Sequence, residues 1–206
     1  MQAKTFCFCS GNVIMKLLLF CFILFAFSCS VLQNNGYLSR VDKLMNGHSF
    51  VYGLPYQTGK SYLVIQGYES LFSHAGDYAI DFKMKPGTKV MAARGGIVIR
   101  IRDSTKTGGI GKKYVGTANG IVIRHTDSTY AHYLHLQYKG ALVSVGDTIR
   151  QGQLIGLSGS TGFSAFPHLH FEVTRQMGIS REDFPVLFQT SKGIKFLQPL
   201  HWYKAL

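Results

Sequence analysis

Two histidines and one glutamate occupy alternate positions near the C-terminal end of the chain, in the stretch Pro167-His168-Leu169-His170-Phe171-Glu172-Val173. Alternate side chains of a β-strand share a face, so the three polar side chains point one way and the apolar ones between them face a core. Neutral imidazole nitrogen is a good zinc ligand. The pattern therefore predicts a β-strand with a metal-binding face.

Further ligands are available upstream of this strand. His74 and Asp81 bracket a short loop, and Asp81 opens a predicted strand, so both can converge with His170 across a sheet. All four cysteines lie within the first 29 residues, so a metal site elsewhere must use histidine and carboxylate ligands. A catalytic zinc takes three protein ligands and keeps a fourth position for water. We expect one zinc ion on His74, Asp81 and His170, with Asp77 as the rival carboxylate.

Two histidines remain near the expected metal, His132 and His168. In a hydrolase, they would act as the base for a water molecule and as the donor to a tetrahedral oxyanion. A nearby zinc ion disfavours their imidazolium forms, which suits a base near neutral pH. Glu172 either orients a ligand histidine or forms a salt bridge on an edge strand. The other histidines have no partner in the pattern and are expected to be ordinary surface or core residues: His48, His125, His135 and His201.

The elements that must position these residues are short strands. The chain has 206 residues, 46% of them hydrophobic, and its 23 glycines and many β-branched residues favour strands and tight turns. Short apolar runs separated by turn signals predict a mainly β fold, a small antiparallel β-sandwich or barrel with an open groove that contains the metal. We expect the domain at residues 49–175, with its core at 67–174. A polar linker at 30–48 would precede it, and a C-terminal extension at 176–206 would pack onto it.

The N-terminal segment has the pattern of an export signal. Lys16 is followed by an apolar run from Leu17 to Phe27, which is typical of a secretory signal peptide. The run is short for a membrane-spanning helix, which needs about 20 residues, although an uncleaved anchor is an alternative. Cys29 ends the run in a context that resembles a bacterial lipoprotein processing site. Residues 1–29 are thus predicted to be a signal peptide or a lipoprotein signal and anchor, and the protein is expected in the cell envelope, either in the periplasm or lipidated at Cys29.

The charge of the chain excludes some partners. The formal net charge is +12 at pH 7, which favours anionic envelope polymers or lipid head groups as neighbours. The basic residues are scattered, without the clusters interleaved with aromatic residues that a nucleic-acid surface shows, so no nucleic acid is expected. The stretch 108–113 is rich in glycine and lysine, but Lys106 stands where a phosphate-binding loop needs glycine. A nucleotide site is therefore rejected.

Several stretches, in this order between residues 67 and 174, resemble the motifs of the lysostaphin-type zinc metallo-endopeptidases, which cleave peptide bonds in bacterial peptidoglycan. Besides His74 and Asp81 these are Lys85-Pro86-Gly87-Thr88-Lys89-Val90, Asn119-Gly120-Ile121-Val122-Ile123, Tyr130-Ala131-His132, Gly152-Gln153-Leu154-Ile155-Gly156, Ser158-Gly159-Ser160-Thr161-Gly162 and Pro167-His168-Leu169-His170-Phe171-Glu172. The resemblance implies a small antiparallel β domain with an open groove. It also implies zinc on His74, Asp81 and His170, with His132 and His168 assisting catalysis. His74 and Asp81 are seven residues apart, whereas the family usually spaces them by four.

The function expected from these residues is a zinc-dependent endopeptidase, with metal-activated water as the nucleophile and peptidoglycan peptides as the substrate. The envelope membrane would be a second partner, through the N-terminal anchor. The alternative is a catalytically silent family member that binds or regulates cell-wall hydrolases. Such proteins usually lack a metal or catalytic position, and all five positions are present here, which favours the enzyme. The sequence leaves the oligomeric state open.

Overall fold

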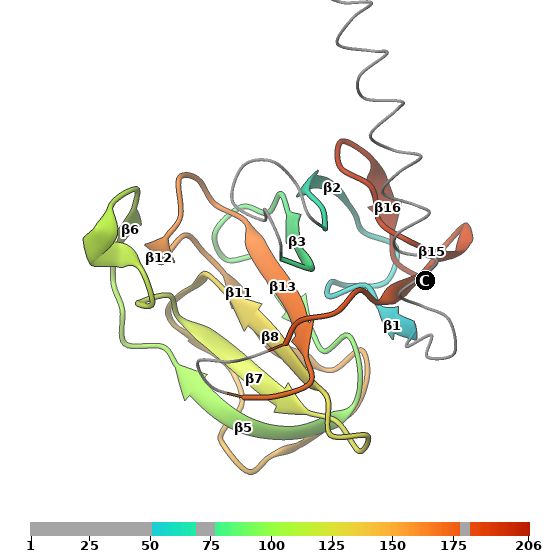
Figure 1. Ribbon diagram of the computed structural model, residues 1–206, viewed down its shortest axis with the longest axis horizontal. Coiled ribbons are helices and arrows are strands. Elements are labelled where there is room, and N and C mark those ends of the chain that lie inside the picture. The colour runs from blue at the N-terminus through green and yellow to red at the C-terminus, as the bar shows by residue number, and fades with distance from the viewer. Residues whose placement is uncertain (1–50, 69–76, 178–181) are drawn as a thin grey trace, which may run out of the picture. The chain divides into compact units, whose positions relative to one another are not determined.

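The computed structural model describes residues 51–68, 77–177 and 182–206 (Figure 1). The predicted signal segment at 1–29, the linker at 30–48, Cys29 and His74 lie outside these residues. No helix in the described part of the chain is both long enough and apolar enough to cross a membrane.

The largest sheet has eight strands and carries the predicted metal-binding strand near its middle. In spatial order, its strands are β10 (Thr148–Ile149), β5 (Gly96–Arg102), β7 (Gly120–Arg124), β8 (Tyr130–Leu134), β13 (Leu169–Thr174), β3 (Ala79–Phe82), β2 (Ser61–Gln66) and β16 (Trp202–Lys204). All neighbours in this sheet are antiparallel. The order runs from β10 to β16 without closing into a barrel. The mainly β, antiparallel prediction is therefore confirmed, in its open form.

Smaller sheets complete the domain. One contains β4 (Lys89–Met91), β11 (Leu154–Ser158) and β9 (Leu136–Ala141), and another contains β1 (Val51–Gly53), β14 (Leu187–Thr190) and β15 (Gly193–Lys195). A two-stranded pair joins β12 (Gly162–Phe163) to β6 (Gly108–Gly109), beside a 3₁₀ turn at Lys112–Tyr114. The pairs β1–β14 and β12–β6 are parallel. C-terminal residues thus supply β14, which pairs with β1, and β16, which pairs with β2.

An aromatic cluster fills the core where four of these strands meet: β1, β8, β13 and β14. Phe171, on the apolar face of β13, has its ring centroid 5.2 Å from that of Tyr133 and 5.6 Å from that of Phe188. Tyr52 of β1 lies edge-on to Phe171 at 6.0 Å. All four side chains are at most 1% exposed. The apolar face of β13 therefore packs into the core, as its alternating pattern predicts, and this fixes the direction of the polar face.

Two irregularities in the strands shape the site. The pairing of β2 with β3 shifts register between Val64 and Gln66, which marks a β-bulge. The second irregularity lies between β8, in the large sheet, and β9, in the three-stranded sheet with β4 and β11. Only His135 separates these two strands, and its φ is +63°. The chain thus changes sheets across one residue with a left-handed backbone, a conformation in which histidine is enriched several-fold among non-glycine residues.

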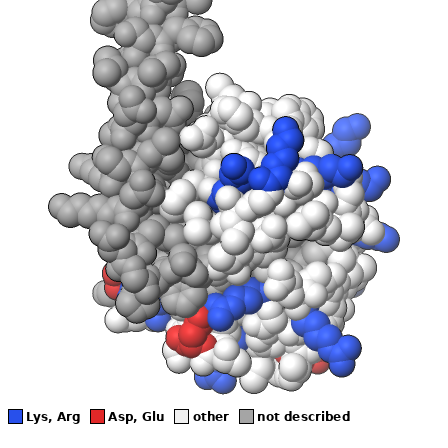
Figure 2. Space-filling model, turned by 90° about the vertical axis from the view of Figure 1, so that its right-hand side faces the viewer, with Lys and Arg blue, Asp and Glu red and all other residues white. Residues whose placement is uncertain are grey.

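Basic side chains are spread over the face of the domain that Figure 2 shows, with few acidic ones among them. This matches the scattered charge pattern of the sequence. The face displays no continuous basic stripe of the kind that tracks a nucleic-acid backbone.

Candidate active site

The polar face of β13 carries the centre of the site. His170 stands opposite Asp81 of β3 on one side and opposite Leu134 of β8 on the other. Nδ1 of His170 donates a hydrogen bond to Oδ1 of Asp81 at 3.0 Å. Asp81 is 2% exposed, so its carboxylate is removed from water and held by neighbouring side chains. The structure therefore brings two of the three predicted zinc ligands together.

The two ends of the imidazole of His170 face carboxylates from different strands. Its Nε2 lies 3.6 Å from Oε2 of Glu172, two residues further along β13. Glu172 is buried, and β13 has a neighbour on both sides, so this glutamate does not stand on an edge strand. Glu172 thus contacts a predicted ligand histidine, which is the placement required to orient that histidine.

His132 lies on β8, the strand next to that of His170, but at the level of Glu172 and not of His170. It stands opposite Glu172, and its Nδ1 lies 3.9 Å from Oε1 of that glutamate. Its Nε2 shares a hydrogen bond of 3.0 Å with Oγ1 of Thr174. Because residues two positions apart in a strand are separated by about 6.6 Å, His132 is one row removed from the pair His170 and Asp81. Its predicted catalytic role stays a prediction.

His168 lies beside the carboxylate of Asp81. Nε2 of His168 is 3.7 Å from Oδ2 of Asp81. Its Nδ1 donates a hydrogen bond of 2.8 Å to the carbonyl oxygen of Phe166, and the hydroxyl of Ser164 is 3.4 Å from the same nitrogen. A carbonyl oxygen only accepts, so Nδ1 carries a proton, and the neutral form of the ring has its lone pair on Nε2. This tautomer suits a proton acceptor that faces the site.

His135 is a member of the cluster that the sequence pattern did not identify. Its ring centroid lies 4.5 Å from that of His168 and 5.8 Å from that of His170. Its Nδ1 donates a hydrogen bond of 2.7 Å to the carbonyl oxygen of Thr161, so this ring has the same tautomer as His168. We expected an ordinary surface or core histidine here. His135 comes directly after the strand that carries His132, and a residue at a strand end can turn toward the site; this is the signal that could have found it.

The charges around these imidazoles favour a cation. Burial lowers the pKa of His170, but its contacts with Asp81 and Glu172 outweigh burial and raise that pKa to about 10. Two buried carboxylates therefore stabilise positive charge at this point. The pKa of His135 is lowered to about 3, first by burial and then by the charges of His168 and His170. His135 is accordingly neutral near pH 7.

The donor atoms of the described residues fit zinc. The described residues offer imidazole nitrogen and carboxylate oxygen, both of which bind zinc, and their thiolate-free chemistry matches the expected site. Asp77 is exposed, whereas Asp81 is buried among histidines. Within residues 51–68, 77–177 and 182–206, no group of three His, Cys, Asp or Glu side chains is placed to hold a metal ion. His74 lies outside those residues.

An aromatic and basic rim borders the histidines. The ammonium of Lys83 lies 4.4 Å from the ring centroid of Phe166, and that ring is 5.6 Å from the ring of His168. Lys83 follows Asp81 by two positions on the chain, so alternation places its exposed side chain on the same side as that of Asp81. Phe166 is 41% exposed. A ligand that approaches His168 would therefore meet an apolar ring and a positive charge.

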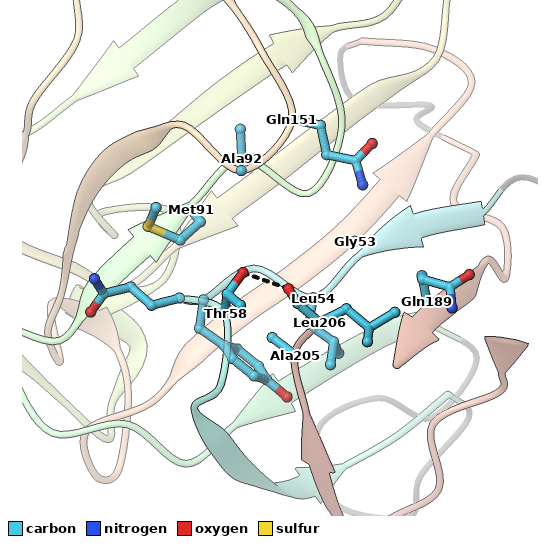
Figure 3. A pocket seen from close by; sticks show the side chains of 12 residues that line it. Gly53, Leu54, Thr58, Met91, Ala92, Gln151, Gln189, Ala205 and Leu206 are labelled. Carbon is cyan, nitrogen blue, oxygen red and sulfur yellow. Dashed lines mark hydrogen bonds between the residues drawn. The ribbon is translucent and has the colours of Figure 1, made fainter. Parts of the chain in front are cut away.

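A cavity of about 340 Å³ lies apart from this cluster (Figure 3). Its walls come from residues near β1, β4, β14 and the C-terminal segment, and it includes the hydrogen bond from Thr58 to the backbone oxygen of Leu206. None of its lining residues is a histidine, an aspartate or a glutamate. The histidine cluster, and not this cavity, carries the groups that can perform hydrolysis.

Comparison with known proteins gives consistent matches over this domain. Lysostaphin of Staphylococcus simulans is 36% identical over 117 residues, which are 56% of this chain and 22% of lysostaphin. The glycyl-glycine endopeptidase ALE-1 of Staphylococcus capitis is 35% identical over 117 residues, or 56% of this chain and 30% of that protein. The peptidoglycan DD-endopeptidase ShyA of Vibrio cholerae is 38% identical over 93 residues, or 45% of this chain and 19% of that protein. The match thus spans less than a third of the length of these relatives.

The crystallised catalytic domain of lysostaphin from Staphylococcus simulans is similar to 60% of this chain, over 87% of that domain, with 32% identity and a TM-score of 0.44. The model of peptidase family M23 matches residues 75–181, just over half of the chain. That interval includes Asp81, His135, His168 and His170, and it begins one residue after His74. The chain belongs to peptidase family M23.

Proposed function

We propose that this protein is a zinc-dependent endopeptidase that hydrolyses peptide bonds in bacterial peptidoglycan. One observation carries the proposal: in a domain of peptidase family M23, the buried carboxylate of Asp81 contacts His168 and His170, and the ring of His135 lies next to both histidines. Several relatives, among them a peptidoglycan DD-endopeptidase and a glycyl-glycine endopeptidase, support the same substrate class.

Asp81 and His170 are the described residues that would hold the zinc ion, and His74 is the proposed third ligand. Their net charge would leave the bound ion with one positive charge, because Asp81 is the single carboxylate among them. When bound, zinc supplies a Lewis acid for the substrate carbonyl and a water molecule of lowered pKa. Glu172 contacts His170 and would keep that ring in its ligating orientation.

His168 and His135 are the residues that we propose for proton transfer. Both rings donate Nδ1–H to backbone carbonyls, so both present Nε2 as an acceptor. An imidazole held in this way can accept a proton at Nε2 and later donate it to the leaving amine. The sequence motif assigned this work to His132 together with His168. The contacts of His132 with Glu172 and Thr174 support a different role, in the row of side chains behind the ligands.

The proposed location is the cell envelope. Peptidoglycan is outside the cytoplasm, and the apolar run from Leu17 to Phe27 is a signal that would deliver the chain there. Lipidation at Cys29 would hold the domain at the membrane surface, where its basic side chains meet anionic head groups. Both features belong to the proposal.

The test combines a metal analysis with a hydrolysis assay on the purified full chain. We expect one zinc per chain and release of new amino termini from peptidoglycan, and both should disappear with a chelator and return with added zinc. Asp81→Ala should lose metal and activity together, whereas Gln151→Ala, an exposed change, should lose neither. A zinc-loaded protein that releases nothing from several wall chemistries would favour the alternative, a silent family member that binds or regulates wall hydrolases.

A further inference from the structure

The second oxygen of the Asp81 carboxylate is held by a residue outside the metal and histidine motifs. Gln66, the last residue of β2, donates from Nε2 to Oδ2 of Asp81 at 3.0 Å. On the opposite side, His170 donates to Oδ1 at the same distance. The carboxylate is therefore fixed through both oxygens, by one side chain from each strand that flanks β3.

The β-bulge in β2 is what turns Gln66 toward the site. Val64 pairs with Phe82, so in a regular antiparallel ladder Ile65 would pair with Asp81 and Gln66 with Ile80. Ile80 is fully buried on the face opposite to Asp81, since alternate residues of a strand face opposite ways. The bulge instead pairs Gln66 with Asp81. One inserted residue thus moves an amide from the core face to the face of the histidines.

We propose that Gln66 is a positioning residue for Asp81, which it holds in the orientation needed to bind the metal ion. The inference rests on the proposed function in naming Asp81 as a zinc ligand. It adds a residue that the metal and histidine motifs do not include. The bulge gives the contact a structural reason, since bulges near active sites commonly re-aim a side chain.

The chemistry of an amide suits this position. A buried carboxylate oxygen without a donor costs free energy and is free to rotate toward other partners. A lysine or arginine would satisfy the oxygen but would place a full positive charge beside the proposed cation. The neutral N–H of Gln66 satisfies Oδ2 and adds no charge, so the negative charge of Asp81 remains available to the metal.

The first measurement uses metal-free protein and needs no change at Gln66. In proton–nitrogen NMR spectra of the full chain, the side-chain amide of Gln66 should exchange slowly with solvent and differ in shift from the exposed amide of Gln151. Asp81→Ala should remove the protection, and Asp147→Ala, a change at an exposed carboxylate, should leave it. An amide of Gln66 that exchanges as fast as that of Gln151 in the unmodified protein would overturn the inference.

The second measurement compares zinc affinities by competition with a chromophoric chelator. Gln66→Met keeps the length of the side chain and removes the donor, and Gln151→Met is the matched control. We expect Gln66→Met to bind zinc about 10- to 100-fold more weakly, as changes to groups that orient metal ligands typically do. The control should match the unmodified protein. Circular dichroism and the midpoint of thermal unfolding establish that each variant is folded.

The outcomes separate this inference from the proposed function. A folded Gln66→Met variant that binds zinc within about twofold of the unmodified chain contradicts the positioning role, while the enzyme assignment stands. An unmodified chain that binds no zinc contradicts the proposed function instead. In that case, the exchange of the Gln66 amide alone decides whether this residue holds Asp81.

Discussion

The imidazole rings of His135 and His168 lie with their centroids 4.5 Å apart, and each donates Nδ1–H to a backbone carbonyl. The carbonyls belong to Thr161 and Phe166, in the segment that leads into β13. One segment of chain therefore sets the tautomer of both rings. When neutral, each ring keeps its proton on Nδ1, so the two rings can present two acceptor nitrogens to one site.

Replacing His135 with alanine should reduce the rate of peptide hydrolysis by about 10²- to 10⁴-fold while one zinc stays bound, because a positioned acid–base group contributes that much. His168→Ala should behave in the same way. The double variant should lose less than the product of the two losses, since both residues serve one transition state. Single-turnover rates on peptidoglycan fragments, with zinc measured for each variant, provide the test.

The matched control for this prediction is His132→Ala. The contacts of His132 with Glu172 and Thr174 predict a smaller loss of rate, accompanied by weaker zinc binding. The opposite result would be slow hydrolysis by His132→Ala with its zinc still bound, together with an unchanged hydrolysis rate for His135→Ala. That result would show that His132, as the sequence motif predicts, is the catalytic histidine.

The choice of carboxylate can be tested by metal content. Asp81→Ala and His170→Ala should each abolish zinc binding, because their side chains meet at 3.0 Å inside the cluster. Asp77→Ala should retain zinc, since Asp77 is exposed. Zinc loss in Asp77→Ala with zinc retained in Asp81→Ala would mean that the other carboxylate is the ligand.

Removal of the Phe171 ring should destabilise the domain strongly. Phe171 is 1% exposed and packs against Tyr133, Phe188 and Tyr52, so Phe171→Ala should lower the free energy of unfolding by about 3–5 kcal/mol. The control is Phe163→Ala, at a side chain that is 46% exposed, for which less than about 1 kcal/mol is expected. Urea unfolding followed by fluorescence measures both. Equal losses in the two variants would show that the ring cluster does not stabilise the core.

The stability of the domain should fall as the pH drops below about 6.5, in part because of His125. Burial lowers the pKa of His125, and the charge of Arg94 acts in the same direction against a raising effect of Asp127 and the Gly95 carbonyl. Its folded pKa is below its unfolded value, so the unfolded chain takes up a proton first. The contribution of His125 to the free energy of unfolding is therefore complete above the unfolded pKa. It is lost as the pH falls from the unfolded pKa toward the lower folded pKa.

The measurement is the urea midpoint between pH 7.5 and pH 5 for the unmodified chain and for His125→Asn. Asparagine can keep a donor near the Gly95 carbonyl, which accepts from Nδ1 of His125 at 2.7 Å, and it does not titrate. The variant should show a shallower decline with falling pH. His201→Asn, at an exposed histidine, should follow the unmodified chain. Identical slopes for all three proteins would remove His125 from the explanation.

Cys29→Ser tests the proposed lipid anchor. If Cys29 is lipidated, a fatty-acid label should tag the unmodified chain in bacterial cells, and the variant should carry no label. In cell fractionation, the Cys29→Ser variant should leave the membrane fraction or appear as an unprocessed precursor. Equal labelling of both proteins would defeat the lipoprotein interpretation.

Periodicity predicted the parts of the fold that depend on alternation. The pattern around His170 placed Phe171 in the core and His170 with Glu172 on the opposite face, because a strand leaves each side chain only two directions. The proximity of His170 and Asp81 could also be predicted, since both residues belong to strands that the motif requires to converge. Sequence patterns of this kind are local and regular, and here the chain obeys them.

The residues that escaped prediction are at irregular points of the chain. His135 lies where the chain leaves β8 with a positive φ, and Gln66 lies beyond a β-bulge. In both places, the direction of the side chain depends on backbone angles that alternation does not encode. For His132, the sequence supplied the residue type and the strand, but not the pairing with Glu172, because the register of β8 against β13 is set by pairing across the whole sheet.

The pairing of Tyr52 in β1 with Phe188 in β14 makes the domain a structure of long-range contacts. A sheet joined in this way closes its largest loop late, and β proteins with such high contact order fold in milliseconds to seconds. While residues 187–204 are still inside a ribosome, β1 and β2 lack the partners β14 and β16. Nascent chains that end before residue 187 should therefore stay sensitive to protease. If the chain is exported unfolded, as proposed, this delay would keep β1 and β2 without these partners until residues 187–204 have been synthesised.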